Sequence, residues 1–356
     1  MAALDAWIDK EARFAAAAML RAVSATDLIK DRPGFGQRVI PRPGSVVASP
    51  VLAAYDPDPD YFFHWFRDSA IVIDALRAAE GLEKRIAVER LREFVDFSRS
   101  LQGLDGREFL RQRHFREKVQ ASFLQYLRPD DEIAAVFGDA VPAEARVNPD
   151  GTLDFTRWAR PQNDGPALQV LALTRWRDAQ PDLDETLRAA MLELVVGDLD
   201  FMQSRARERS FDIWEEEFGY HYYTQLVQAE ALARGAEWLA ETSHSARARA
   251  CLSEADELAS SLDAHWSAAD GYYRSRTGVV GGAPEKALDI AVILGVLHAG
   301  RAKGAHSVLD PRAQATLTAL EDMFDAEYAI NRARPPDCGP AMGRYANDVY
   351  FGGNPW

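Results

Sequence analysis

The sequence predicts an all-α protein whose helices form antiparallel pairs, arranged as a toroid of helical hairpins. In nine segments, apolar residues recur at spacings of three and four, with good helix formers between them. Short and long loops alternate between these segments, which indicates sequential hairpins. The nine segments are residues 3–24, 67–80, 85–101, 163–178, 185–204, 219–241, 243–263, 285–297 and 310–326.

The strict alternation of apolar and polar residues that predicts β-strands is nearly absent. We expect short strands only near Val46–Ser49 and at Tyr272–Tyr273. Because a ring of six hairpins needs twelve helices, the chain is expected to hold about nine of the twelve. No linker, low-complexity tract or block of like charge divides the sequence, so we expect a single domain over residues 1–356.

The composition and charge narrow the classes of partner. Apolar residues make up 47% and charged residues 27%, the balance of a soluble globular protein. A net charge of −14 repels phosphate backbones, so we expect no nucleic-acid partner, whereas a neutral sugar is compatible with it. No stretch approaches the ~18 consecutive apolar residues of a membrane span, so no membrane partner is expected. We expect a monomer.

The start of the chain lacks the pattern of a signal peptide. Met1 is followed by Ala-Ala-Leu-Asp rather than by a basic and then an apolar stretch. We expect a cytoplasmic protein if Met1 is the natural start, and a secreted or periplasmic one if a leader has been removed.

Two long loops, residues 31–61 and 331–356, are rich in Pro and Gly and hold many of the aromatic residues. Loops of this length in a compact domain are usually functional or disordered. Disordered segments are poor in aromatic residues, so we expect ordered loops that build a binding site.

The first candidate site segment is residues 61–69, Tyr-Phe-Phe-His-Trp-Phe-Arg-Asp-Ser, in which aromatic residues precede Arg67 and Asp68. Aromatic rings stack on the apolar C–H faces of sugars, and carboxylate and guanidinium groups bind sugar hydroxyls. The alternative is an aromatic core cluster with an ion pair at the start of a helix, and the spacing alone favours this alternative.

The second candidate segment is residues 211–219, Phe-Asp-Ile-Trp-Glu-Glu-Glu-Phe-Gly, with three glutamates after Trp214. A general acid that works near neutral pH needs a raised pKa, and apolar packing and like-charge neighbours both raise a carboxyl pKa. The alternative is a set of acidic residues in the first turn of a helix, where the helix dipole favours them. Taken alone, the pattern favours this alternative.

Two further candidate segments each contain a tryptophan and an arginine. In residues 158–166, prolines and a glycine fix a turn, and Trp158 and Arg160 either face a ligand or pack internally. Residues 343–356 offer Arg344, Asp348 and Trp356, or else form a glycine-rich surface loop. The usual phosphate, zinc and nucleophile motifs are absent and the seven histidines are scattered, so we expect no metal site and no cofactor.

These four segments, in this order, resemble the glucoamylases of glycoside hydrolase family 15, and the resemblance covers nearly the whole chain. It implies an (α/α)6 barrel that removes glucose from the non-reducing ends of α-1,4-glucans with inversion. Two positions depart from the family pattern, since Ile213 stands where leucine is usual and Ala159 where glycine is usual.

The resemblance also implies roles for single residues. Glu215 would be the general acid, and Glu216 would bind a sugar hydroxyl on the leaving-group side. Arg67 and Asp68 would bind hydroxyls of the terminal glucose, and Arg344 would bind hydroxyls near the scissile bond. The rings that would wall the pocket are those of Tyr61, Trp158, Trp214 and Trp356.

An inverting glycosidase also needs a second carboxylate that activates water, ~6.5–9.5 Å from the acid. In the family this base lies beyond the Asn-Pro-Trp motif, at which the present sequence ends. We therefore expect the base outside these 356 residues, and we expect the chain to be a C-terminally incomplete version of the domain, in agreement with the helix count.

Other functions remain open. One is a catalytically inactive sugar-binding or regulatory protein, and another is a family member that acts on α-1,6-glucan or trehalose. A toroid lyase or epimerase for acidic sugars ranks last, because such sites need basic or histidine residues and the candidate segments are acidic and aromatic.

Overall fold

The structure is a computed structural model, and it describes residues 2–52, 60–79, 81–111, 115–335, 338–350 and 354–355. Within these ranges the chain forms eleven α-helices, nine of which have nine residues or more. The long helices are α1 (Ala2–Ala22), α2 (Phe66–Ala78), α3 (Lys84–Leu101), α6 (Gly165–Ala179), α7 (Glu185–Arg205), α8 (Tyr222–Ala240), α9 (Ser245–Ser261), α10 (Ala291–Ala299) and α11 (Pro311–Glu327).

Each long helix overlaps one of the nine predicted segments, so the helical prediction is confirmed. Two helix starts were predicted wrongly. Helix α8 begins at Tyr222 rather than at 219, because strand β6 (Phe218–His221) occupies the preceding residues. Helix α10 begins at Ala291 rather than at 285, because residues Pro284–Ala287 form a separate 3-10 helix, after which the Asp289 carboxylate accepts a hydrogen bond from Ala291 N (2.7 Å). Two short helices, α4 (Gly106–Arg111) and α5 (Asp130–Ala134), were not predicted.

The strands have two to four residues, too short for an alternating pattern to show in the sequence. The predicted strand at Tyr272–Tyr273 is confirmed as β8, which pairs with β7 (Trp266–Ser267). The predicted strand near Val46–Ser49 is wrong, since Val46 makes only an isolated bridge with Val23. The remaining strands are β1 (Lys30–Arg32), β2 (Gln37–Val39), β3 (His64–Trp65), β4 (Arg146–Val147), β5 (Ser210–Phe211), β9 (Arg276–Thr277), β10 (Val349–Tyr350) and β11 (Asn354–Pro355).

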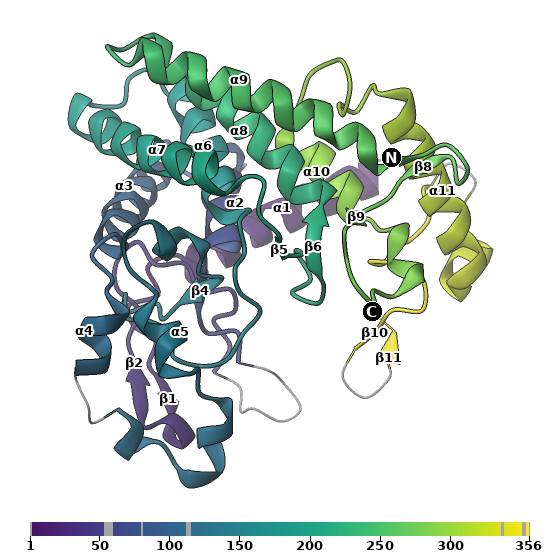
Figure 1. The fold of residues 1–356 in the computed structure, drawn as a ribbon. Helices are drawn as coiled ribbons and strands as arrows, with labels where there is room; N and C mark the ends of the chain where they lie inside the picture. Colours follow the sequence, from purple (N-terminus) through teal and green to yellow (C-terminus); the bar gives the residue numbers. More distant parts are fainter. Residues whose placement is uncertain are drawn as a thin grey trace. The chain divides into compact units, whose positions relative to one another are not determined.

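The chain divides into two compact units. Unit 1 comprises residues 1–161 and 168–201, and unit 2 comprises residues 162–167 and 202–356. In unit 1, α2 packs against α1 and α3 (Figure 1). A separate apolar cluster of unit 1 gathers around Phe35, Ile133 and Phe155, where α5 and the loops near it bury their apolar side chains.

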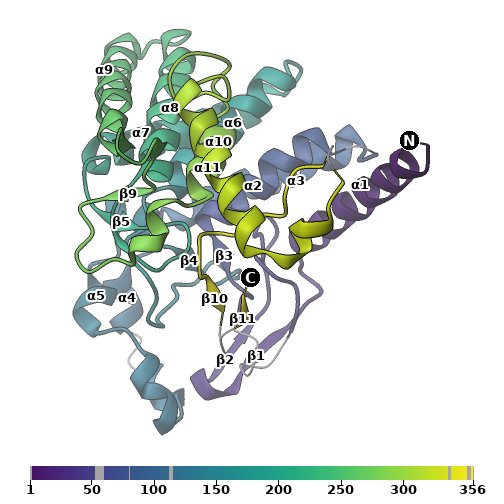
Figure 2. The same cartoon turned by 90° about the vertical axis from the view of Figure 1, so that its right-hand side faces the viewer.

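Helix α8 is the centre of unit 2. It packs against both α9 and α10, and α11 packs against α10 and β8 (Figures 1 and 2). Apolar side chains cover most of α8, as expected of a helix that is buried on most sides. Strands β5, β6 and β9 form an antiparallel sheet in the order β5-β6-β9, and the turn between β5 and β6 holds the three glutamates.

None of the helices in the described ranges is both long enough and apolar enough to cross a membrane.

Candidate active site

The three glutamates lie in a tight turn between β5 and β6, and Asp212 organises this turn. The backbone carbonyl of Asp212 accepts a hydrogen bond from Glu215 N (3.0 Å), and its carboxylate accepts one from Glu216 N (2.7 Å). The turn is followed by a strand and not by a helix. The alternative in which the glutamates form the first turn of a helix is therefore wrong.

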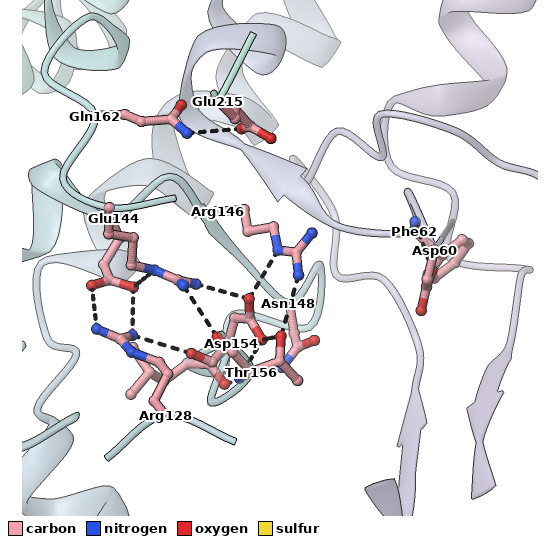
Figure 3. Close-up of polar contacts among 12 residues, drawn as sticks. Asp60, Phe62, Arg128, Glu144, Arg146, Asn148, Asp154, Thr156, Gln162 and Glu215 are labelled. Carbon is pink, nitrogen blue, oxygen red and sulfur yellow. Dashed lines mark hydrogen bonds and ion pairs between the residues drawn. The ribbon is translucent and has the colours of Figure 1, made fainter. Parts of the chain in front are cut away.

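Glu215 is held in an unusual conformation at the tip of this turn. Its backbone φ is 66°, a left-handed value that residues other than glycine rarely adopt. Such a backbone typically costs ~1–3 kcal/mol and occurs most often at functional sites. The buried amide of Gln162 donates to Glu215 Oε1 at 2.8 Å (Figure 3). This hydrogen bond orients the carboxyl group, and its donor carries no charge.

Glu216 is surrounded by donors from distant parts of unit 2. Its Oε2 accepts hydrogen bonds from Lys286 Nζ (2.6 Å) and Tyr345 Oη (2.7 Å), and its Oε1 lies 3.1 Å from Arg344 Nη1. Lys286 Nζ also donates to Asp212 Oδ2 at 3.0 Å. Burial alone would lower the pKa of Lys286, but the Asp212 and Glu216 carboxylates outweigh burial and raise that pKa. Lys286 therefore stays charged beneath Glu216.

Arg344 connects three of the predicted site residues. Its Nε and Nη2 each donate to one oxygen of the buried Asp348 carboxylate, both at 2.6 Å. Such a two-pronged pair fixes the plane of the guanidinium. The guanidinium carbon lies 5.2 Å from the centre of the Trp214 ring, close enough for a cation–π contact. The structure thus brings together Trp214, Glu216 and Arg344, three of the residues to which the sequence analysis gave site roles.

Asp289 binds the indole N–H of Trp214. The indole Nε1 lies 3.1 and 3.0 Å from the two oxygens of the Asp289 carboxyl. Burial raises the pKa of Asp289 to about 7. The next residue, Ile290, donates its backbone N–H to the carbonyl oxygen of Arg344 at 2.9 Å. Asp289 therefore ties the turn that carries Glu215 to helix α10 and to the segment that carries Arg344.

Glu217 has a structural role. It forms an ion pair with Arg276, and its Oε1 accepts a hydrogen bond from Ala283 N at 2.8 Å. Its side chain therefore holds the segment after β9 and does not belong to the set that surrounds Glu216.

In unit 1, the predicted rings form a cluster around Arg146. The Arg146 guanidinium lies 3.6 Å from the centre of the Trp158 ring and 4.8 Å from that of Trp65. The Trp65 ring is 5.8 Å from Trp158 and 5.9 Å from Tyr61. Trp65 therefore connects Tyr61 and Trp158, the two rings that the sequence placed in a pocket wall.

A buried network of ion pairs holds the segment around Trp158 in place (Figure 3). Arg160 donates to Glu144 (2.7 Å) and to Asp154 (2.8 Å), and Arg146 also donates to Asp154 (2.9 Å). Burial opposes the charge on Asp154, but Arg146 and Arg160 outweigh it and lower the pKa of that carboxyl. Of the two roles considered for Arg160, internal packing is the one observed.

Arg67 and Asp68 lie in the first turn of α2, with 3.6 Å between Arg67 Nε and Asp68 Oδ2. The Asp68 side chain is 43% exposed, so it is open to a ligand even though it pairs with Arg67. Trp356 lies outside the described residues.

Several neighbours of the predicted residues were not identified as site residues from the sequence. They are Gln162, Asp212, Lys286, Asp289 and Tyr345. Gln162, Asp212 and Tyr345 stand inside the candidate segments, but their contacts do not show in the spacing. Lys286 and Tyr345, for example, are 70 and 129 residues away from Glu216.

Comparisons with known proteins identify the family of the chain. Residues 36–109 and 145–356 match the sequence model of Glycosyl hydrolases family 15. Glucoamylase 1 of Rhizopus oryzae is 27% identical over 99% of this chain and 52% of its own length. Glucoamylase-1 of Arthroderma benhamiae is 30% identical over 88% of this chain and 47% of its own length. The chain thus spans about half the length of these curated relatives.

The fold agrees with that of a solved relative. The structure of a glucoamylase from Saccharomycopsis fibuligera superposes with a TM-score of 0.75 at 22% identity, over 99% of this chain and 70% of that chain. Because glucoamylases of this family are (α/α)6 toroid proteins, the predicted fold class is confirmed. Because the family's sequence model matches most of its residues, the chain belongs to glycosyl hydrolases family 15.

Proposed function

We propose that the protein is an exo-acting α-glucosidase of the glucan 1,4-alpha-glucosidase type. It would release glucose from the non-reducing ends of maltooligosaccharides or starch-like α-glucans by inverting hydrolysis. The observation that carries this proposal is the turn of residues 212–217, which presents Glu215 at φ 66° beside a second carboxylate bound by Lys286, Arg344 and Tyr345.

In this mechanism Glu215 protonates the glycosidic oxygen. Gln162 donates to Oε1, so that oxygen acts as an acceptor and the proton to be transferred is carried by Oε2. An amide donor carries no charge, so this hydrogen bond can fix the orientation of the side chain without adding a positive charge. Gln162 is thus suited to hold a general acid in position.

The remaining predicted residues bind sugar in this proposal. Arg67 and Asp68 bind hydroxyls of the terminal glucose, and Glu216 and Arg344 bind hydroxyls on the leaving-group side. The rings of Tyr61, Trp158, Trp214 and Trp356 contact the sugar faces. Such contacts suit a neutral polyhydroxylated ligand, because rings take its apolar faces and charged groups its hydroxyls.

The water-activating base is not assigned to a residue of the described chain. Asp289 does not suit the role, because it is buried and its carboxyl is bound by Trp214 Nε1 and by Ala291 N. Asp212 does not suit it either, because its two oxygens are bound by backbone N–H groups and by Lys286.

The test is to incubate the protein with maltotriose and to follow the anomer of the released glucose by NMR. Inverting cleavage releases β-glucose first. Glu215→Gln is expected to lower kcat by ~10²–10⁴-fold, the usual contribution of a general acid. The control is Glu237→Gln, which changes an exposed glutamate of α8 and should leave kcat unchanged. Unchanged turnover in Glu215→Gln would exclude Glu215 as the acid.

The same assay separates the alternatives. Calorimetric binding of maltotriose without turnover would support the sugar-binding or regulatory alternative. Faster cleavage of isomaltose or trehalose than of maltose would assign a different linkage within the family. Activity on uronides with none on maltose would support a lyase or epimerase.

A further inference from the structure

Trp214 carries the aromatic ring of the turn that presents Glu215. The residue is half-buried, so part of its ring can meet a ligand. The Arg344 guanidinium lies 5.2 Å from the ring centre. A cation–π contact of this kind attracts the face of the ring as a whole and leaves the position of the ring edge undetermined. A second, directional contact is therefore needed to fix the ring.

The buried carboxyl group of Asp289 supplies this contact. The indole N–H is the single hydrogen-bond donor of a tryptophan side chain. In Trp214 its nitrogen lies 3.1 and 3.0 Å from the two oxygens of Asp289. Because the two distances are nearly equal, a sideways shift of the ring edge would lengthen one of them. The carboxyl group thus restrains the ring edge in its present place.

Asp289 is itself held by the backbone around it. Its Oδ1 accepts a hydrogen bond from Ala291 N (2.7 Å) at the start of α10, a helix that packs against α8. Residue 289 also forms an isolated β-bridge with Tyr345, and Ile290 N donates to the carbonyl oxygen of Arg344. The group that fixes the edge of the ring and the cation on its face therefore belong to adjoining, hydrogen-bonded segments.

A carboxyl group is a costly choice at this position. Burial opposes its charge and raises the pKa of Asp289 to about 7, with the nearby Asp212 acting in the same direction and Lys286 against it. The start of a helix does not require this cost, because a serine or an asparagine can also accept a hydrogen bond from a backbone N–H there. The contact with Trp214 is the feature that a carboxyl group serves better than these residues.

We propose that Asp289 is a positioning residue for substrate binding, which acts by holding the Trp214 ring in the orientation that receives a glucose unit. Asp289 touches neither the substrate nor the reacting atoms in this role. The inference rests on the proposed function, since it takes Trp214 as a ring that contacts the sugar.

The first test is the kinetics of Asp289→Asn with maltotriose. Asparagine has the same shape, but it places an NH₂ donor where one of the two oxygens faces the indole N–H. KM should rise about tenfold, as for one lost hydrogen bond to a charged group. Because Gln162 and the Asp212 carbonyl hold Glu215 independently of Asp289, kcat should stay within about threefold.

Two further variants serve as a control and as a safeguard. Asp256→Asn makes the same change at an exposed position of α9 and should leave KM and kcat unchanged. Asp289→Ser can still accept the hydrogen bond from Ala291 N, but its shorter side chain does not reach the indole. It should raise KM as Asp289→Asn does, so the inference can be tested even if asparagine disturbs folding.

A double-mutant cycle tests whether Asp289 acts through Trp214. Trp214→Phe keeps a ring at this position and removes the N–H. In that background, Asp289→Asn should change KM by less than about twofold, because the contact is already lost. An equal rise of KM in both backgrounds would overturn the inference, since Asp289 would then act through the fold in general.

An NMR measurement tests the contact without any sugar. The indole ¹H–¹⁵N resonance of Trp214 is identified by its absence in Trp214→Phe. Asp289→Asn should move this proton resonance upfield, because a weaker hydrogen bond shields the proton, and Asp256→Asn should leave it in place. An unmoved resonance in Asp289→Asn would also overturn the inference.

Binding measurements separate this inference from the proposed hydrolysis. In the Glu215→Gln background, calorimetry should show weaker maltotriose binding after Asp289→Asn. If the parent cleaves no substrate but this difference persists and disappears in Trp214→Phe, the hydrolysis is wrong and the role of Asp289 stands. If maltotriose is cleaved and Asp289→Asn changes neither KM nor binding, the hydrolysis stands and the role of Asp289 is wrong.

Discussion

The Trp158 region of unit 1 and the Glu215 turn of unit 2 contain the same kinds of residue, but the structure uses them differently. In unit 1, Arg146 and Arg160 both bind the buried Asp154, and Arg160 also binds the buried Glu144. In unit 2, the tip of the turn is partly open, and Glu216 remains 37% exposed in spite of its three partners. Arginine, carboxylate and tryptophan thus build a scaffold in one region and a binding surface in the other.

The comparison shows that exposure and partner choice distinguish the two roles. A buried ion network must satisfy its own members, because an unpaired buried charge is costly. A ligand-binding carboxylate must keep part of its surface open and rely on fixed donors behind it. Charge changes should therefore affect the stability of unit 1 strongly and the stability of unit 2 weakly.

The largest effect on stability is expected for Asp154→Ala. This change leaves Arg146 and Arg160 buried without their shared carboxylate, so the free energy of unfolding should fall by ~3–5 kcal/mol. Urea unfolding measures the loss. Asp139→Ala, at an exposed position of unit 1, is the control and should stay within ~0.5 kcal/mol. A loss below ~1 kcal/mol for Asp154→Ala would mean that the network is not a scaffold.

A smaller, pH-dependent effect is expected for Asp198→Asn in α7. Asp198 is buried and accepts a hydrogen bond from the amide of Gln169 (2.8 Å), and burial raises the pKa of Asp198 from 3.8 to about 8. The stability that the neutral carboxyl contributes is thus fully present below about pH 4 and lost as pH rises through about 8. Asparagine stays neutral, so the variant should be more stable than the parent at about pH 9 and similar near pH 4.

Unfolding curves at several pH values test this difference between Asp198→Asn and the parent. The control is Asp200→Asn, an exposed residue of the same helix, which should follow the parent at each pH. If Asp198→Asn also follows the parent, the buried carboxyl does not titrate as proposed.

The smallest effect on stability is expected for Glu216→Gln, because Lys286 keeps Asp212 as a partner and the lost pair is partly exposed. The free energy of unfolding should change by less than ~1 kcal/mol. The KM for maltotriose should rise on the order of tenfold, as for one lost charged hydrogen bond of ~1.5 kcal/mol. An aryl α-glucoside, whose leaving group lacks sugar hydroxyls, should show no change in KM. A large loss of stability with unchanged KM would place Glu216 in the scaffold.

The sequence was most informative where periodicity is strong. Every predicted helical segment contains a helix, because apolar spacing depends only on residues within a few turns of each other. Periodicity misplaced the start of a helix where the residues before it form another local structure. At residues 219–221 the pairing of β6 with β5 and β9 replaces the helix. Before α10, a separate 3-10 helix over Pro284–Ala287 occupies the residues where the helix was expected to begin.

For the site, the sequence identified the residues that stand in distinctive motifs and missed those that support them. Trp214, Glu216 and Arg344 were predicted and lie together. The roles of Lys286 and Asp289 were not predicted, because a lone lysine or aspartate in an apolar segment carries no local signal.

By itself, the sequence determined the helical fold class, the family and the motifs that carry the candidate chemistry, since these depend on residue types at fixed spacings along the chain. Only the tertiary structure decided which charges are buried scaffold and which remain open to a ligand. It also decided that Lys286 and Tyr345, 70 and 129 residues away from Glu216, would meet at one of its oxygens. The physical reason is that desolvation and hydrogen bonding depend on distances in space, which chain separation does not encode.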